Sequence, residues 1–259
     1  MTTRHLLLIP ILISCASSSN IIAKEGTVYE TIEKSFKVSS GGSLSLENTN
    51  GWVDVTSWDK DRVEVIAEKD ASAPTEAEAR RLLEETEVRA TQTGNHITIK
   101  TKRKDWSLGG KRRLHINYKV KVPRRFNVSA ETVNGSVDVE EISGSVEAKT
   151  VNGNVDMESI RGSFNASSVN GAIRADLTQI EESHDLSAHT VNGSLTITLP
   201  KNVKADLRAK TLNGSINSDF ELSVKGRIGK RVSGKINGGG PELHLQTLNG
   251  SIRIRKQQN

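Results

Sequence analysis

The sequence predicts an all-β fold, a β-solenoid or β-helix with coils of about eighteen residues, and three observations support it. A Thr-Val-Asn-Gly-type phrase recurs six times, and its first three copies are eighteen residues apart. A fixed short period with identical turn residues is the signature of stacked repeats. Apolar and polar residues alternate between the phrases, as in strands. Aromatic residues make up only 3% of the chain, which suits a narrow core of Val, Ile, Leu and Ala.

The first 23 residues predict an export signal and a tether. A charged start is followed by eight apolar residues, 6–13. This run is too short for a membrane-spanning helix, which needs about twenty residues, and is typical of a secretory signal. Leu12-Ile13-Ser14-Cys15 resembles a bacterial lipobox, so Cys15, the single cysteine, is the expected site of lipidation. The alternative is ordinary signal-peptidase cleavage after Ala23.

Residues 26–123 predict a β-rich unit with one short helix. Alternating apolar residues between 35 and 65, broken by Gly41-Gly42 and Asn50-Gly51, indicate strands and turns. Thr75 followed by Glu78 forms a capping box, so a helix begins there and ends near Thr86. Further strands are expected over 87–91, 96–102 and 113–122, the last closed by a proline.

The repeat region, 124–256, places its residues at a constant phase. Apolar residues two and four positions after each glycine are expected to face inward, with polar residues between them facing water. A third apolar residue before each turn is expected to complete the inward set. This third set consists of Val133, Ile142, Val151, Ile160 and Val169.

Two architectures fit this pattern. An antiparallel meander would use each Asn-Gly as a hairpin turn. A solenoid would stack the coils in parallel, about 4.8 Å apart, with aligned corners. Only the solenoid explains why the four residues recur at one phase, because stacked Asn side chains can form an amide ladder. We therefore favour the solenoid.

The period stretches after the third copy of the phrase, so we expect insertions on one side of the stack. The last predicted strand carries Arg253, Arg255 and Lys256. A charged strand at an open end would oppose edge-to-edge aggregation.

With these features described, the sequence resembles the bacterial putative-adhesin family of β-strand-repeat proteins of unknown function. The resemblance covers nearly all of the chain after the export signal. It rests on residues 43–51, 58–63 and 118–123, the six phrases, and Gly239-Gly240-Pro241 before Leu243. It implies an export signal, a strand-rich front and Asn-Gly repeats, and it brings no catalytic residues.

Two sets of candidate site residues follow. The repeat turns are structural candidates, and they comprise Asn134, Gly135, Asn152, Gly153, Asn170, Gly171, Asn192, Gly193, Asn213, Gly214, Asn249 and Gly250. The net charge is +5, and the densest basic stretch lies between residues 100 and 125. Such a stretch attracts anionic surfaces. Its candidate binding residues are Lys102, Arg103, Lys104, Lys111, Arg112 and Arg113.

The sequence does not favour a metal or catalytic site. Calcium-binding β-rolls need an Asp in nearly every unit, yet the position of Asp138 and Asp156 becomes Arg174 in the next coil. The close histidines His184 and His189 have no cysteine or clustered carboxylate nearby. A Ser-His-Asp triad around His184 lacks the strained nucleophile turn. Glycosidase chemistry would need one close carboxylate pair with separated pKa values. The candidate acids for such a pair are Asp138, Glu140, Glu147, Asp156 and Glu158.

These observations predict a non-enzymatic exported envelope protein, an adhesin-like binding or scaffold module without a cofactor. Its expected partners are an envelope polymer, a glycan or a protein surface, and the membrane if Cys15 is acylated; nucleic acid is not expected. The expected location is the cell envelope, as an outer membrane lipoprotein or in the periplasm. The alternatives are a solenoid that polymerises end to end and a carbohydrate-active β-helix enzyme. The three tryptophans, Trp52, Trp58 and Trp106, are expected to cap the front of the solenoid or to stack on sugars.

Overall fold

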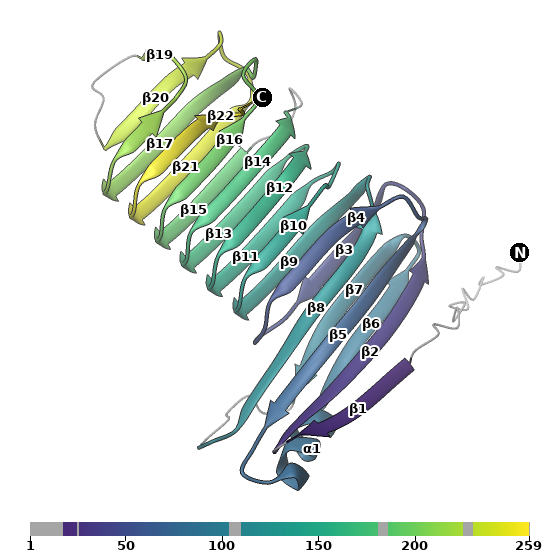
Figure 1. The fold of residues 1–259 in the computed structure, drawn as a ribbon. Helices are drawn as coiled ribbons and strands as arrows, with labels where there is room; N and C mark the ends of the chain where they lie inside the picture. Colours follow the sequence, from purple (N-terminus) through teal and green to yellow (C-terminus); the bar gives the residue numbers. More distant parts are fainter. Residues whose placement is uncertain (1–17, 25, 104–109, 181–185, 225–229, 259) are drawn as a thin grey trace, which may run out of the picture.

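The computed structural model is a flattened stack of coils made of two facing sheets (Figure 1). It describes residues 18–24, 26–103, 110–180, 186–224 and 230–258. In the described residues each sheet contains eleven strands, and the helix α1 (Glu76–Glu84) lies at the N-terminal end of the stack. The predicted β-solenoid, with a strand-rich front and one short helix, is confirmed.

Sheet A and sheet B are named by their strands in spatial order. Sheet A contains β1 (Ser18–Lys24), β2 (Thr27–Lys37), β5 (Arg62–Ser72), β8 (Arg113–Pro123), β4 (Val53–Trp58), β10 (Val137–Glu140), β12 (Val155–Arg161), β14 (Ile173–Gln179), β16 (Leu195–Leu199), β22 (Ile252–Lys256) and β18 (Ile216–Ser218). Sheet B contains β19 (Leu222–Val224), β20 (Arg231–Ile236), β17 (Ala205–Asn213), β21 (Glu242–Asn249), β15 (Leu186–Asn192), β13 (Phe164–Asn170), β11 (Val146–Asn152), β9 (Phe126–Asn134), β3 (Gly42–Glu47), β7 (His96–Arg103) and β6 (Thr86–Thr93).

In the repeat region each coil contributes one strand to each sheet, and like strands of successive coils pair in parallel. Val137, Asp138 and Val139 of β10 lie beside Val155, Asp156 and Met157 of β12. The parallel pairing excludes the hairpin meander. The alternation of the strands places Val, Ile, Leu and Ala between the sheets, where one apolar core runs from Phe36 to Ile254.

The helix begins as predicted. Thr75 accepts a hydrogen bond from the backbone N–H of Glu78, 3.3 Å away, and thereby caps the first turn. Ala79, Leu82 and Leu83 are buried on one face. The strands expected over 87–91, 96–102 and 113–122 are β6, β7 and β8.

The N-terminal strands continue both sheets without a break in the core. The coil β3–β4 pairs in parallel with β9 and β10, and the coil β7–β8 pairs in parallel with β3 and β4. Antiparallel strands lie beyond β7 and β8. The segment expected to be part of the tether contains β1, which pairs with β2 over seven residues.

The expectation that the last strand forms an open end is wrong. The final coil, β21–β22, lies between β15–β16 and β17–β18, so β22 is an inner strand. The outermost strands at this end are β18 and β19, each three residues long. Very short edge strands limit edge-to-edge pairing. The insertions of the repeat all follow strands of sheet A, so they leave the stack on one side, as predicted.

Candidate functional site

The Asn-Gly phrases form one edge of the stack, where the chain passes from sheet B to sheet A. We call it the Asn-Gly edge (Figure 1). The first residue of each phrase is a buried Thr or Ser. Its hydroxyl donates a hydrogen bond to the glycine carbonyl of the preceding coil, for example from Thr150 to Gly135 over 2.8 Å and from Thr190 to Gly171 over 2.9 Å. Because the hydroxyl is satisfied, a polar residue is tolerated at the border of the core.

The glycines permit the coils to approach closely at this edge. A Cβ atom added at Gly153 would overlap the carbonyl oxygen of Gly135, and one added at Gly171 would overlap that of Gly153. Any side chain at these corners would force neighbouring coils apart. This steric requirement explains why glycine recurs at this position.

The asparagines form a continuous amide ladder of seven residues. Each Nδ2 donates to the Oδ1 of the neighbour nearer the front of the stack, and the donor–acceptor distances are 2.7–2.9 Å. In spatial order the ladder consists of Asn50, Asn134, Asn152, Asn170, Asn192, Asn249 and Asn213. All amides therefore point the same way along the stack. The second N–H and a lone pair of each amide remain available at the exposed edge.

The second residue of each phrase corrects the sequence prediction. Val133, Val151 and Val169 were expected to face the core, but they lie on the outside, whereas Ile142 and Ile160 are buried as expected. The outward residues of the phrases form an apolar ridge beside the ladder, and their exposed fractions are 39–51%. The ridge consists of Val133, Val151, Val169, Leu248 and Leu212. In spatial order the less exposed Val191 lies between Val169 and Leu248. A row of exposed apolar side chains is a candidate interaction site.

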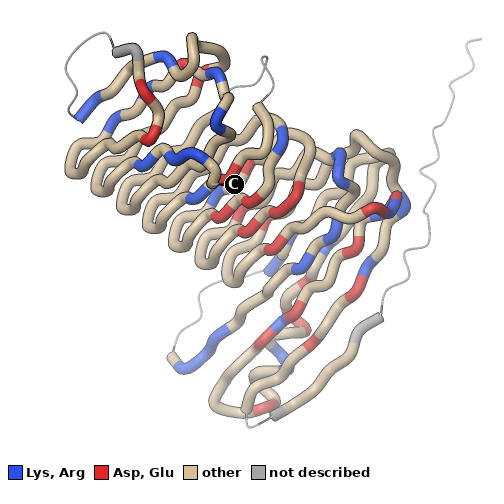
Figure 2. The backbone as a smooth tube through the Cα atoms, turned by 45° about the horizontal axis from the view of Figure 1, so that its top comes forward, with Lys and Arg blue, Asp and Glu red and all other residues tan. Residues whose placement is uncertain are grey.

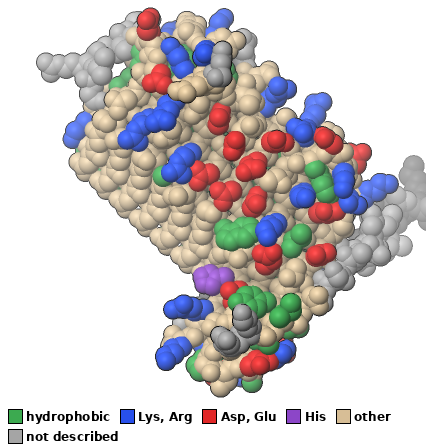
Figure 3. Space-filling model, viewed as in Figure 1, with side chains coloured by type: hydrophobic (Ala, Val, Ile, Leu, Met, Phe, Trp, Pro, Cys, Tyr) green, Lys and Arg blue, Asp and Glu red, His purple; other side chains and the backbone are tan. Residues whose placement is uncertain are grey.

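The outer face of sheet A is the second notable surface (Figure 3). In-register pairing aligns Asp138 with Asp156 and Glu140 with Glu158. With Asp54, which is aligned with Asp138, these side chains form what we call the acidic strip. Figure 2 shows that the acidic residues gather near the middle of this face and that basic residues lie on both sides of them.

The carboxyl groups of Asp138 and Glu140, both in the acidic strip, have a raised pKa. Burial is the main cause for Asp138, whose pKa is raised further by Asp156 and Asp54 although the hydroxyl of Ser136 lowers it. Burial also raises the pKa of Glu140, with contributions from Asp54, Glu158 and other nearby acids. Acidic side chains therefore lie side by side along the strip, where each disfavours the charged form of its neighbour.

The arginines of β22 lie farther along the same face. Arg253 and Arg255 are exposed and align with Thr196 and Thr198 of β16. A shallow depression of about 510 Å³ lies between them and the acidic strip, lined in part by Arg174, Asp176 and Ser194. Sequence reasoning assigned β22 to an open end and therefore missed this arginine pair as part of a face.

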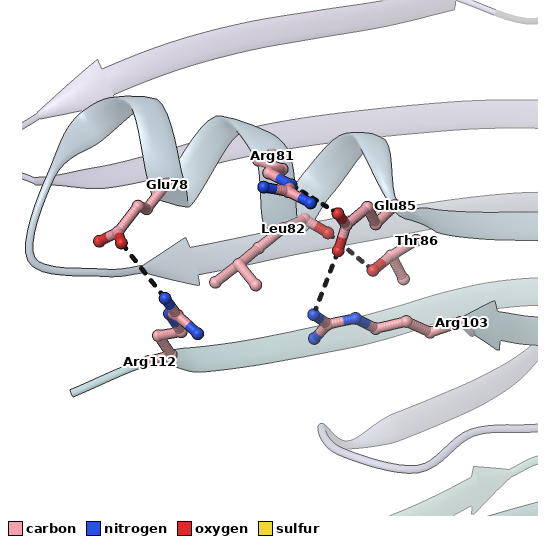
Figure 4. Close-up of polar contacts among 7 residues, drawn as sticks. All are labelled: Glu78, Arg81, Leu82, Glu85, Thr86, Arg103 and Arg112. Carbon is pink, nitrogen blue, oxygen red and sulfur yellow. Dashed lines mark hydrogen bonds and ion pairs between the residues drawn. The ribbon is translucent and has the colours of Figure 1, made fainter. Parts of the chain in front are cut away.

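The predicted basic surface is only partly assembled (Figure 4). Arg103 has a 6% exposed side chain and lies 3.6 Å from Glu85. Arg112 pairs with Glu78 of α1 at 3.2 Å. Lys111 and Arg113 are exposed near the start of β8, and Lys102 lies on β7. Lys104 lies outside the described residues, as does Cys15.

Trp52 and Trp58 do not cap the front of the stack. Trp52 precedes β4 and Trp58 ends it, both half-buried within the stack rather than at its end. Lys119 lies over Trp52, and Lys60 lies 4.6 Å from the ring centre of Trp58. Trp106 and His184 fall outside the described residues. Among the described residues, no group of three or more His, Cys, Asp or Glu side chains has the arrangement of a metal site.

No helix in the described part of the chain has the length and apolar character needed to span a membrane. At the Asn-Gly edge the glycine corner, the Thr or Ser hydroxyl and the Asn amide recur from coil to coil. The sequence identified its Asn and Gly residues but placed its valines on the wrong side.

The solved structures that match this chain share little sequence with it. A "putative cell adhesion protein" from Clostridium sporogenes has 12% identity and a TM-score of 0.49, and the match covers 87% of this chain and 99% of that one. A "putative adhesin" from Bacteroides fragilis has 11% identity and a TM-score of 0.43, with 86% and 96% covered. No curated protein matches the chain.

A family model matches about half of the chain. It is described as Toastrack DUF4097 and aligns with residues 125–255, the region of the Asn-Gly repeats. The chain therefore belongs to the Toastrack DUF4097 family.

Proposed function

We propose that this protein is a non-enzymatic, exported envelope module that binds an extended glycan or similar polymer along its Asn-Gly edge. The observation that carries the proposal is the amide ladder with the apolar ridge beside it. Both run over successive coils at about the 4.8 Å spacing of parallel strands.

The two features complement the chemistry of a polysaccharide chain. Sugar hydroxyls can exchange hydrogen bonds with the outward amide groups, and the C–H faces of sugar rings can pack on Val151, Val169 and their neighbours. Each contact is weak, but a rigid row engages several repeats of one polymer at once. Binding then gains from the high effective concentration of the later contacts.

The acids of the sheet A face support a binding role over glycosidase activity. A glycosidase needs one carboxyl group held protonated and another held ionised, so their environments must push the two pKa values apart. Here the environment raises the pKa of both Asp138 and Glu140. Between these two groups the environment does not separate an acid from a nucleophile, so the carbohydrate-active enzyme is kept as the alternative to the binding role.

We include in the proposal that Cys15 is the lipid anchor. Cleavage after Ala23 would remove six of the seven residues of β1, which pairs along β2. Processing at the lipobox would leave β1 whole. Replacing Cys15 by Ser should release the protein from the membrane fraction, and protease treatment of intact cells should show on which side of the envelope it lies. A Cys15→Ser protein that stays in the membrane would contradict this part of the proposal.

Cosedimentation with insoluble envelope polysaccharides tests the binding proposal. We expect the double variant Val151→Ser/Val169→Ser to bind at least about tenfold more weakly, a loss of about 1.4 kcal/mol. Tyr29→Ser is the matched control, because Tyr29 is another exposed apolar residue, 43% exposed, far from the ridge. Equal binding by wild type and the ridge variant, or no binding by wild type to any envelope polymer, would refute the assignment.

The alternative of end-to-end assembly is less favoured by the geometry at the C-terminal end, where the edge strands β18 and β19 are short. Light scattering of the purified protein distinguishes the two. Long polymers whose size grows with concentration would favour assembly.

A further inference from the structure

The outer face of sheet A carries two oppositely charged clusters at different places along the stack. The acidic strip occupies β4, β10 and β12. The arginine pair, Arg253 and Arg255, lies on β22. Between β10 and β22 in the sheet lie only β12, β14 and β16, so four strand spacings of about 4.8 Å separate the clusters by about 19 Å.

Most of these charges have no opposite partner in the chain itself. Asp156 pairs with Arg174 at 3.0 Å. Within the described residues, no other salt bridge joins a member of the acidic strip or the arginine pair. Burial is the main cause of the raised pKa of Asp138 and of Glu140, and neighbouring carboxylates on this face raise both further. A partner that brings positive charge to the strip and negative charge to β22 would relieve both clusters.

A second copy of the chain has this distribution of charge. A two-fold axis that lies between two facing sheets, parallel to their strands, reverses the order of the strands in the second copy. With the axis over β14, β10 of each copy faces β22 of the other. The position along the strand is unchanged by this rotation. Because the parallel register aligns Asp138 with Arg253 through Asp156, Arg174 and Thr196, this acid then faces an arginine. Glu140 and Arg255 each lie two residues farther along the same two strands, although the register between β12 and β14 is irregular after Met157.

We propose that the outer face of sheet A is a self-association surface, on which a second copy docks through a two-fold axis parallel to the strands near β14. The surface differs from the Asn-Gly edge and from the ends of the stack. It therefore leaves the edge free and produces a closed pair, because a two-fold contact uses the same patch on both copies.

The size of the overlap predicts a weak association. With the axis over β14, seven strands overlap, from β4 to β18. At about 4.8 Å per strand and about four residues of about 3.3 Å each, they cover roughly 440 Å² per copy. A standard stable complex buries about 800 Å² per partner. The charged contacts should also weaken as salt screens them, since the Debye length falls from about 30 Å at 0.01 M to about 3 Å at 1 M salt.

Sedimentation of the purified full chain carrying Cys15→Ser tests the proposal without contributions from a lipid anchor. We expect a monomer–dimer equilibrium in about 0.01 M salt and at least a tenfold smaller association constant in about 1 M salt. Two charge-reversed proteins sharpen the test: Asp138→Lys/Glu140→Lys and Arg253→Glu/Arg255→Glu. Each should remain monomeric alone, because like charges then face each other, and an equal mixture of the two should form a heterodimer.

Lys37→Glu/Lys111→Glu is the matched control. It changes the net charge as much as the β22 variant, and both lysines are exposed, Lys37 at the end of β2 and Lys111 before β8, outside the overlap. This control should dimerise like wild type, and so should the ridge variant Val151→Ser/Val169→Ser. A wild-type monomer at every concentration in low salt would overturn the proposal. So would a mixture of the reversed variants that stays monomeric, which would point to a different basic partner for the strip.

Discussion

Replacing Gly153 by Ala is the most direct test of the close approach between coils. The new Cβ would overlap the carbonyl oxygen of Gly135, which belongs to the backbone and cannot rotate away. Separation of the corner would strain three hydrogen bonds. They are the Thr150 hydroxyl to Gly135, 2.8 Å, the Gly135 N–H to the Asn152 carbonyl, 3.0 Å, and the Asn152 amide to Asn134, 2.8 Å.

The expected loss of folding stability can be estimated from these contacts. Three hydrogen bonds at about 1 kcal/mol each and an overpacking cost of about 1–3 kcal/mol give a loss of roughly 4–6 kcal/mol if the corner cannot relax. Partial relaxation lowers this figure to about 3 kcal/mol. Such a loss is a large fraction of the total stability of a typical domain, about 5–15 kcal/mol.

Urea unfolding followed by circular dichroism measures the effect. With a slope of about 2–3 kcal/mol per molar urea, the midpoint should fall by about 1 M or more. Gly94→Ala is the control, because Gly94 has a left-handed φ of 59° but open space around its Cβ position. It should cost only about 1–2 kcal/mol from backbone strain. If Gly153→Ala is no more destabilising than Gly94→Ala, steric contact between coils does not explain the recurring glycine.

Three further predictions concern the interior of the stack and its charges. Thr190→Val removes a buried hydroxyl and leaves the Gly171 carbonyl without its side-chain donor, so the free energy of unfolding should fall by about 1–2 kcal/mol. The control Thr196→Val, on the outer face, should lower it by less than about 0.5 kcal/mol. Asn170→Asp removes the donor to Asn152 and places a charge inside the ladder, so the free energy of unfolding should fall by about 1–3 kcal/mol at neutral pH. A thermal midpoint equal to that of the wild type would contradict a continuous ladder. The stability should also depend on pH, because folding raises the pKa of Asp138. The stabilisation from this group is fully present below its unfolded pKa, near 3.8, and is lost as the pH rises through its folded pKa. Asp138→Asn should therefore stabilise the protein at pH 7 and not at pH 3. Glu147→Gln should do the opposite, because the hydrogen bond from Lys149 lowers the pKa of Glu147, whose contribution is present above about pH 4.5 and is lost as pH falls. Urea titrations at several pH values would check both signs.

The architecture could be predicted because its cause is local and repeated. Asn and Gly at one phase indicate parallel stacking, and the structure shows the reason in the ladder from Asn50 to Asn213 and in the glycine corners. The capping box of α1 was equally readable, because its donor and acceptor are three residues apart.

The orientation of Val133 was predicted wrongly although the signal was present. Strict alternation from Ala130 through Thr132 places Thr132 inside and Val133 outside. Hydrophobicity alone favours burial of Val133, but Thr132 is well accommodated at the border of the core because its hydroxyl donates a hydrogen bond to the Gly51 carbonyl. The donor–acceptor pair spans 81 residues of sequence, so the sequence alone offered no reason to bury the threonine.

The order of the last coils could not be predicted from the repeat. The phrases that end at Gly193, Gly214 and Gly250 are nearly identical, so each can stack on any other. The antiparallel pairing of β20 with β17 brings the chain back and permits β21 to lie beside β15. The charged face formed by β10 and β22 depends on this order, and for this reason only the three-dimensional arrangement reveals it.

The interleaved order of the coils also affects how the molecule can be completed. The coil β17–β18 is synthesised before β21–β22, yet its parallel neighbours in both sheets are the strands of that later coil. It cannot take its final place until the last residues of the chain are present. Loss of residues 242–258 would therefore remove an internal layer and leave β15–β16 separated from β17–β18. Because synthesis runs from the N-terminus, the early coils can assemble while the chain is still being made, but the last fifth of the chain, from β17 onward, must wait until synthesis is complete.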